Sequence, residues 1–196
     1  MPSKVEIVNI ALARLGESPI QSLDEGTVPA NMAKVFYDPA RRSALRDFPW
    51  NFALATRRLA RLSEAPSDFL FAFSLPADCL KSVRLRREGV SDFVNTQQLR
   101  YVVRGGQVLT NEEAVTLEYV ADVQDTSLFD DKFIEAMTYK LASELAMPVK
   151  GSVELMANYA NIYSAKMTQA AALSAGEEEE SLSDNPYLEA RQYGNG

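Results

Sequence analysis

The sequence predicts an α+β protein: a four-helix bundle with an inserted small antiparallel β block and an extended acidic C-terminal tail. Apolar residues recur at helical spacing near both ends of the chain, whereas they alternate with polar residues between positions 68 and 120. Four consecutive glutamates follow Gly176, and such a run cannot bury enough apolar surface to fold alone. We therefore assign residues 1–62 and 126–175 to a helical bundle domain, 63–125 to the inserted β domain, and 176–196 to the tail.

Two helices are predicted before the aromatic cluster at residues 48–52. Ser3 and Glu6 have the spacing of a capping box, and apolar residues follow them at helical spacing. Thr27 can cap the second helix. Within that helix, Asp38 and Pro39 predict a kink or a fresh start, because a proline removes a hydrogen bond from a helix interior.

The aromatic residues Phe48, Trp50 and Phe52 lie where this helical pattern ends. Pro49 disfavours helix at the residue before it, so the second helix should end near Asp47. Three large rings so close together carry enough apolar area to anchor a core. We expect them to form a structural hinge, with Trp50 buried between the helices and the strands.

Arg57, Arg58 and Arg61 form a short basic stretch after the hinge. One interpretation is a solvated surface, which is the usual place for charged residues. The other is a subunit interface that faces acidic residues, since arginine suits fixed ion pairs between proteins. The sequence leaves both interpretations open.

The central part of the chain has the alternating pattern of strands. Strands are predicted at residues 69–75, 83–86, 99–104, 107–110 and 115–119. Gly105 and Gly106 separate two of these runs and predict a hairpin, because both glycines can adopt positive φ. Since all of the strands lie in one block of the sequence, we expect a small antiparallel sheet.

Helical spacing returns after Asp130, whose negative charge favours the N-terminus of a helix. The apolar stripe of this third helix comprises Phe133, Met137, Leu141 and Leu145. Pro148 and Gly151 predict its end, and Ser152 can cap the fourth helix. We expect the fourth helix to end near residue 175, where the acidic segment begins.

The composition argues against most enzyme chemistry, so we expect a protein that is not an enzyme and that uses no cofactor. The chain has no histidine, and its single cysteine, Cys79, excludes an internal disulfide. Acidic residues that could hold magnesium are an open alternative: Glu112, Glu113, Glu118, Asp130 and Asp131. No apolar run is long enough to span a bilayer, so we expect a soluble chain made in the cytoplasm.

The net charge of −7 is concentrated in the C-terminal tail. After Gly176 there are six acidic residues and one arginine, so the tail carries five of the seven net negative charges. A strongly basic nucleic-acid binder is therefore not expected. Pro186, Tyr187 and Leu188 follow the glutamates, and an aromatic residue such as Tyr187 after a charged segment is typical of docking sites.

Several short motifs occur in a defined order along the body of the chain. They are Val8-Asn9, Leu15-Gly16-Glu17-Ser18-Pro19-Ile20, Tyr37-Asp38-Pro39-Ala40-Arg41, Pro49-Trp50-Asn51-Phe52-Ala53 and Phe73-Ser74-Leu75-Pro76-Ala77-Asp78-Cys79-Leu80. This set resembles the head-to-tail adaptor (connector) family of tailed phages, and it looks most like the tail tubular protein A type of short-tailed phages. The resemblance covers most of the body and leaves the acidic tail without a matching motif.

The resemblance implies a structural protein of the virion neck with a helical bundle and a β insertion. Twelve copies of such an adaptor form a ring under the portal protein, extend the DNA channel and receive a nozzle or tail tube protein below. DNA then passes without sequence-specific binding, and an acidic chain suits such a channel. In this setting Pro186, Tyr187 and Leu188 would dock on the portal or on a neighbouring subunit.

Two other classes of function stay open. The first is a metal-dependent nuclease or another enzyme, which would bring the clustered acids together in a cleft. The second is a soluble regulatory or chaperone-like binding module that never enters a particle. Magnesium titration separates the first class from an adaptor, and a search for the chain in purified virions separates the second.

Overall fold

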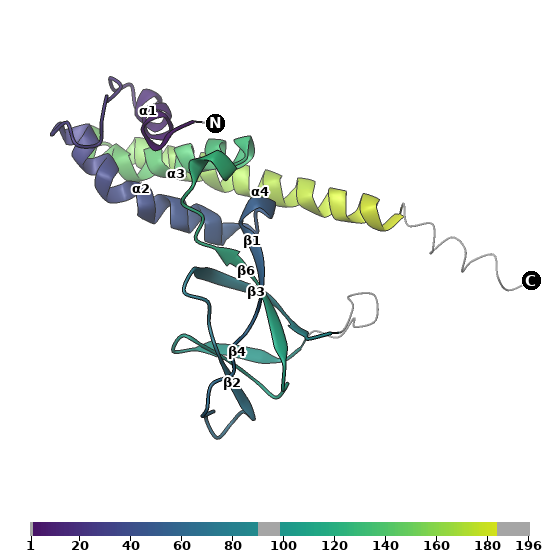
Figure 1. Ribbon diagram of the computed structural model, residues 1–196. Coiled ribbons are helices and arrows are strands. Elements are labelled where there is room, and N and C mark those ends of the chain that lie inside the picture. The colour runs from purple at the N-terminus through teal and green to yellow at the C-terminus, as the bar shows by residue number, and fades with distance from the viewer. Residues whose placement is uncertain (1, 90–98, 184–196) are drawn as a thin grey trace, which may run out of the picture.

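The computed structural model describes residues 2–89 and 99–183, which contain four α-helices and two three-stranded antiparallel sheets (Figure 1). The helices are α1 (Lys4–Arg14), α2 (Val28–Asp47), α3 (Asp131–Lys150) and α4 (Val153–Ser183). The strands are β1 (Leu54–Arg58), β2 (Phe71–Ser74), β3 (Cys79–Arg87), β4 (Tyr101–Arg104), β5 (Gln107–Thr110) and β6 (Val115–Ala121). The predicted α+β class is confirmed.

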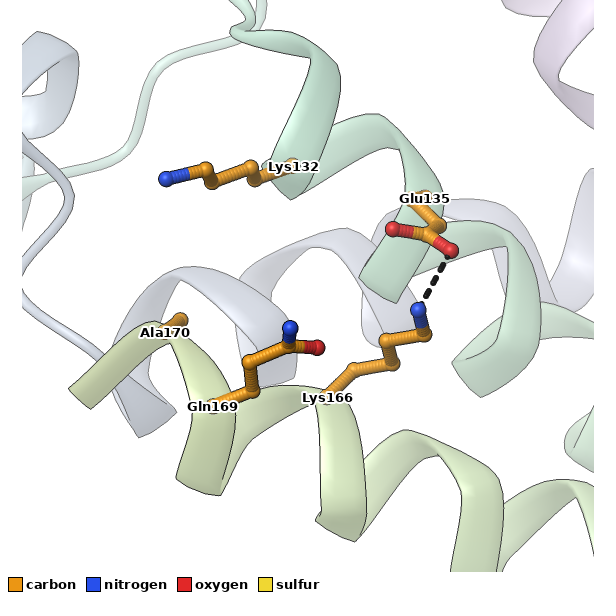
Figure 2. Close-up of a pocket in the computed structure, with 5 residues that line it drawn as sticks. All are labelled: Lys132, Glu135, Lys166, Gln169 and Ala170. Carbon is orange, nitrogen blue, oxygen red and sulfur yellow. Dashed lines mark ion pairs between the residues drawn. The ribbon is translucent and has the colours of Figure 1, made fainter. Parts of the chain in front are cut away.

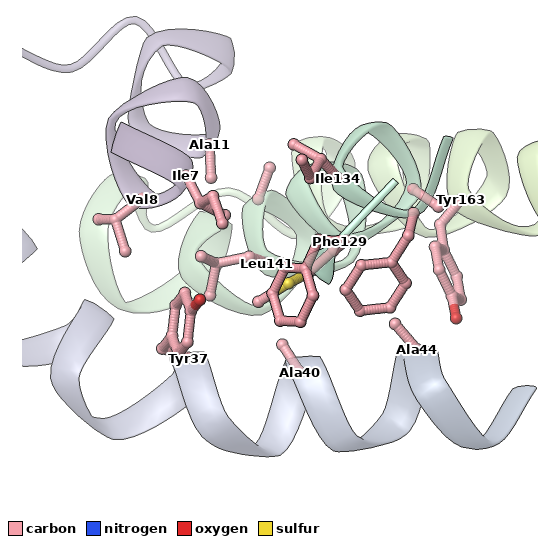
Figure 3. Close-up of a cluster of buried hydrophobic side chains, with 14 of the residues drawn as sticks. Ile7, Val8, Ala11, Tyr37, Ala40, Ala44, Phe129, Ile134, Leu141 and Tyr163 are labelled. Atoms are coloured by element: carbon pink, nitrogen blue, oxygen red, sulfur yellow. The ribbon is translucent and has the colours of Figure 1, made fainter. Parts of the chain in front are cut away.

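Helix α1 begins where the sequence predicts. The Ser3 hydroxyl accepts a hydrogen bond from the Glu6 backbone N–H at 3.2 Å, and the Glu6 carboxylate accepts one from the Ser3 N–H at 2.6 Å. This capping box satisfies two of the free donors at the helix start. The apolar face of α1 buries Ile7, Val8 and Ala11 in the core that the helices share (Figure 3).

Helix α3 is in contact with the three other helices and lies at the centre of the helical part. Its four predicted core residues, Phe133, Met137, Leu141 and Leu145, are each 0% exposed. The helix begins where the negative charge of Asp130 predicted, and the Asp130 carboxylate also caps it by accepting a hydrogen bond from the Phe133 N–H at 2.6 Å. The 3.6-residue spacing identified the face that α3 buries.

Two prolines lie inside helices: Pro39, where the sequence predicts a kink or a fresh start, and Pro148, where it predicts a helix end. Helix α2 continues through Pro39 without a fresh start, and α3 continues through Pro148 and ends at Gly151, which has a φ of 64°. A proline at position 39 leaves the carbonyl of Val35 without its helical donor. Val35 is 59% exposed, so this carbonyl lies on the side of α2 that water reaches. Burial of the opposite side of α2 against α3 outweighs the lost bond.

Helix α4 is longer than expected. The fourth helix was predicted to end near residue 175, but α4 continues through Gly176 and the four glutamates to Ser183. The segment that we had assigned to an extended tail therefore begins as helix. Glutamate and alanine are good helix formers, and adding residues to a helix that already exists is far cheaper than starting one. Residues 184–196 lie outside the described residues.

The β region forms two sheets where one small sheet had been predicted. The strand order is β1-β6-β3 in the first sheet and β2-β5-β4 in the second, and all pairs are antiparallel as expected. The predicted hairpin joins β4 to β5, where Gly105 and Gly106 have φ values of 58° and 75°. Strand β1 begins at Leu54, so the sheet region starts earlier than the predicted boundary at residue 63.

The chain crosses from the first sheet to the second directly after β1. The Leu59 N–H donates to the Val115 carbonyl of β6 at 3.0 Å, and the Ser74 N–H of β2 donates to the Ala60 carbonyl at 2.9 Å. One continuous stretch thus joins both sheets, and their inner faces share a core. The buried members of that core are Leu59, Phe73, Leu85, Val108, Val115, Leu117 and Tyr119.

The chain turns from helix to sheet at Trp50, which is 3% exposed. The Trp50 ring makes edge contacts with Phe48 and Phe133, with centroids 4.9 Å and 5.3 Å away, and Phe52 packs on Phe133 at 5.1 Å. The indole N–H of Trp50 donates to the Ala44 carbonyl of α2 at 3.0 Å. The hinge aromatics therefore tie the end of α2 to the start of α3.

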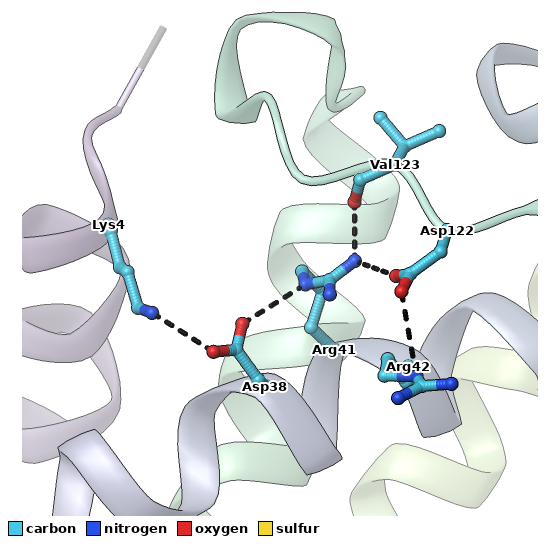
Figure 4. A network of polar contacts seen from close by, with 6 residues as sticks. All are labelled: Lys4, Asp38, Arg41, Arg42, Asp122 and Val123. Carbon is cyan, nitrogen blue, oxygen red and sulfur yellow. Dashed lines mark hydrogen bonds and ion pairs between the residues drawn. The ribbon is translucent and has the colours of Figure 1, made fainter. Parts of the chain in front are cut away.

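A buried ion pair also holds α2 to the segment that follows β6 (Figure 4). Arg41 is 2% exposed, and its Nη1 atom lies 2.6 Å from the Asp122 carboxylate and donates to the Val123 carbonyl at 2.5 Å. The Arg41 Nε atom lies 3.5 Å from Asp38, whose carboxylate also pairs with Lys4 at 3.3 Å. Removing one member of such a pair leaves a buried charge without compensation.

We predict that Trp50→Ala destabilises the protein by about 3–5 kcal/mol, because it removes a large buried ring from a close-packed core. The free energy of unfolding from urea denaturation measures the effect. Leu70→Ala is the control, since Leu70 is 69% exposed and should change stability by less than about 0.5 kcal/mol. If the Trp50→Ala protein unfolds at the same urea concentration as the parent, the hinge has no structural role.

Asp122→Asn should cost about 3–5 kcal/mol, because Arg41 then stays buried beside a neutral amide. The matched control is Arg42→Ala: the Arg42 Nε atom lies 3.7 Å from the same carboxylate, but its side chain is 56% exposed. That control should shift stability by less than about 0.5 kcal/mol. Equal urea midpoints for the two variants would show that the Arg41 pair does not hold the parts together.

Candidate assembly surfaces

The three arginines of the predicted subunit interface are exposed and pair with acids of their own chain. The pairs are Arg57 with Asp78 at 3.7 Å, Arg58 with Glu88 at 2.9 Å and Arg61 with Glu113 at 3.9 Å. Their side chains are 57%, 72% and 53% exposed, respectively. Exposed pairs of this kind contribute about 1 kcal/mol or less, so the guanidinium groups stay accessible to a second carboxylate.

The fold separates Arg57 from the other two arginines. Arg57 and Arg58 are neighbours in strand β1, so their side chains leave the sheet on opposite faces. Arg58 and Arg61 lie on either side of the crossing between the sheets, and both line an open hollow together with Glu113 and Phe73. The structure therefore brings Arg58 and Arg61 into one surface and places Arg57 on another.

Four of the five acidic residues considered as metal ligands, Glu112, Glu113, Glu118 and Asp130, have other partners. The Arg87 guanidinium makes hydrogen bonds of 2.6 Å and 2.8 Å to Glu112, and these bonds hold the pKa of that carboxyl below its ordinary value. Glu118 lies 2.5 Å from the Arg86 guanidinium. Asp130 caps α3. Among the described residues, no group of three or more such ligands lies close enough together to hold a metal ion.

A small pocket between α3 and α4 is lined by Lys132, Glu135, Lys166, Gln169 and Ala170 (Figure 2). The Lys166 ammonium lies 2.7 Å from the Glu135 carboxylate, so the ion pair bridges the two helices. This pair neutralises the charges of Glu135 and Lys166, and the remaining polar groups of the pocket are the Lys132 ammonium and the Gln169 amide. This arrangement joins two helices and does not resemble a reaction centre.

Four exposed cations that the sequence did not group together lie next to one another on α2 and β3: Arg42, Arg46, Lys81 and Arg84. Arg42 and Arg46 are one helical turn apart and share a face of α2. The Lys81 ammonium donates to the Arg46 carbonyl at 3.0 Å, which brings β3 against the end of that helix. We call this set the basic stripe.

An irregularity in β3 aligns the last two members of the basic stripe. Lys81 pairs with Val120 and Arg84 pairs with Glu118, although the two cations are three residues apart in sequence. The register shift between Ser82 and Arg84 adds one residue to β3, so both side chains leave the same face of the sheet. The alternation of Val83 to Arg86 indicates a basic strand face, but no sequence signal predicts the bulge.

The predicted docking residues Pro186, Tyr187 and Leu188 lie outside the described residues, so their role stays a prediction. Cys79 is half-buried, and burial raises the pKa of its thiol above the ordinary value. None of the described helices is both long enough and apolar enough to cross a membrane. No family model matches the chain, and no curated protein matches it significantly.

Proposed function

We propose that this protein is a structural head-to-tail adaptor of a tailed bacteriophage. In this proposal the four helices form the bundle of the adaptor, and the two sheets form its β insertion. A ring of about twelve copies sits under the portal, extends the DNA channel and receives a nozzle or tail tube protein in the virion neck. The protein then carries out no reaction and needs no cofactor.

The observation that carries the proposal is that the adaptor-like motifs have structural roles at the junctions of this fold. The Asn9 side chain makes two hydrogen bonds of 2.9 Å with the backbone of Ile20, which holds the first two motifs together. Arg41 forms the buried pair with Asp122, and Trp50 forms the hinge. The motifs thus hold the scaffold together, as expected for a structural protein.

The distribution of charge also supports this function. The exposed arginines of the sheet region are largely paired with acids of the same chain, as Arg58 is with Glu88 and Arg87 is with Glu112. Affinity for DNA comes mainly from unpaired cations that displace counterions from phosphates. A channel protein with paired charges lets DNA slide past with little retention.

Negative-stain electron microscopy of the protein mixed with its portal tests the proposal directly. The expected result is a ring of copies attached to one end of the portal, coaxial with its channel. If the purified chain instead cleaves DNA in the presence of magnesium and forms no ring, the adaptor proposal is wrong and the nuclease alternative is favoured. A chain that is absent from purified virions would favour the regulatory or chaperone-like module.

We predict that Arg58→Glu combined with Arg61→Glu blocks ring formation and leaves the monomer folded, because both residues line one exposed surface. Ring formation is scored by sedimentation velocity and electron microscopy, and folding by thermal melting. Arg104→Glu is the matched control, since Arg104 of β4 is 59% exposed and pairs with Asp68, which lies in the turn before β2. Normal rings from the double variant would return these arginines to the solvated-surface interpretation.

Deleting the chain after Ala175 should leave a folded body that attaches poorly to the portal. The deletion removes the acidic end of α4 and the residues Pro186, Tyr187 and Leu188, which we expect to dock there. Co-sedimentation of full-length and truncated protein with portal rings, at low and high salt, measures the loss. Equal binding of the two forms would leave this segment without a part in attachment.

A further inference from the structure

The basic stripe is a surface of positive charge that the described part of the chain does not neutralise. Arg46, Lys81 and Arg84 are exposed and form no ion pair with any described residue, and Arg42 reaches Asp122 only at 3.7 Å. Asp122 is already engaged by the buried Arg41 at 2.6 Å. The stripe thus differs from the surface around Arg58 and Arg61, whose arginines have acidic partners.

The same chain carries an unusual negative segment in the part of α4 that continues beyond the C-terminal end of α2, where Tyr163 of α4 donates to Asp47 at 2.7 Å (Figure 1). Helix α4 has its last described buried residue at Ala170 and then continues to Ser183, about 20 Å further at the rise of an α-helix. Figure 1 shows this end of α4 extending past the other helices. Residues 177–180, all glutamate, lie in this projecting part.

Glutamates near the C-terminus of a helix are electrostatically unfavourable. The helix dipole places partial negative charge at that end, and neighbouring carboxylates repel one another. The last turn of α4 contains no basic residue that would offset either effect. A cationic surface supplied by another molecule would stabilise this segment as helix.

We propose that the acidic end of α4 in one copy of this chain docks on the basic stripe of a second copy. Four glutamates meet four cations, and both sets belong to the same chain, so each copy provides one acidic and one basic surface. A surface used in this head-to-tail manner generates rings when the rotation closes. The inference rests on the proposed ring and names the contact that joins neighbouring copies.

Duplex DNA is the other polyanion that could meet the basic stripe, but the charges of the chain favour the second copy. The stripe contains only four cations on a chain whose net charge is −7, and nearby Arg41 and Arg86 are already paired with acids. Occupation of the stripe by a neighbour's glutamates also removes these cations from DNA. A ring built in this way does not retain the DNA that passes through it.

A charge-exchange experiment tests the contact in the full-length chain. The stripe variant carries Arg46→Glu and Arg84→Glu, and the tail variant carries Glu178→Lys and Glu179→Lys. Sedimentation velocity over a range of concentrations measures self-association, and each variant alone should weaken it about tenfold or more. A 1:1 mixture of the two variants and the chain that combines all four changes should both associate again. High salt should weaken association of the parent.

Arg104→Glu is the control for the loss of one exposed arginine, and thermal melting confirms that each variant is folded. Unchanged association of either variant, or no recovery in the combined chain, overturns the proposed contact. If the Arg46→Glu and Arg84→Glu changes abolish binding of duplex DNA but leave self-association unchanged, the stripe binds DNA and the proposed contact is wrong. Co-sedimentation of the parent with portal rings tests the adaptor function separately. If both variants form normal rings, the proposed contact is wrong, but the adaptor function is not affected.

Discussion

The C-terminal end of helix α2 is the point on which the rest of this structure depends. Pro49 stops the helix and has no N–H, so carbonyls of the last turn need donors from elsewhere. The Trp50 indole donates to the Ala44 carbonyl, and the Lys81 ammonium of β3 donates to the Arg46 carbonyl. One donor comes from the hinge and the other from the sheet, so satisfying this helix end fixes the sheets against the helices.

Strand β6 extends the same attachment because its two faces serve two cores. Val120 belongs to the core of the helices, whereas Leu117 and Tyr119 belong to the core between the sheets. Directly after the strand, Asp122 forms the buried pair with Arg41 of α2. The helical and sheet parts therefore cannot rotate against each other without breaking apolar contacts and a buried ion pair together.

The sequence predicted the features that depend on local patterns. The Ser3 and Glu6 capping box, the glycine hairpin of β4 and β5, and the buried face of α3 follow from capping preferences, turn chemistry and periodicity. Where tertiary contacts decide, the sequence was less informative. Burial of one side of α2 keeps the helix continuous through Pro39, which excludes a fresh start there, and the strands form two sheets where one was predicted. The basic stripe was missed for the same reason, since it depends on a bulge near Ser82 and on contact between a helix and a strand.

Two kinds of charged surface on one subunit suggest how such a chain can assemble in order. An arginine that is already paired, as Arg58 is, gains little binding free energy unless the second copy offers a better-placed carboxylate. Such arginines therefore contribute to the specificity of the contact more than to the first attraction between copies. The basic stripe, of which Arg46, Lys81 and Arg84 form no ion pair with a described residue, and the four glutamates of α4 would instead attract each other over a distance of about 8 Å at physiological salt. Long-range attraction would bring copies together first, and the paired surfaces would then select the correct register. A nearly neutral body keeps this attraction confined to the two surfaces, because the excess negative charge lies in the segment that is proposed to be neutralised on assembly.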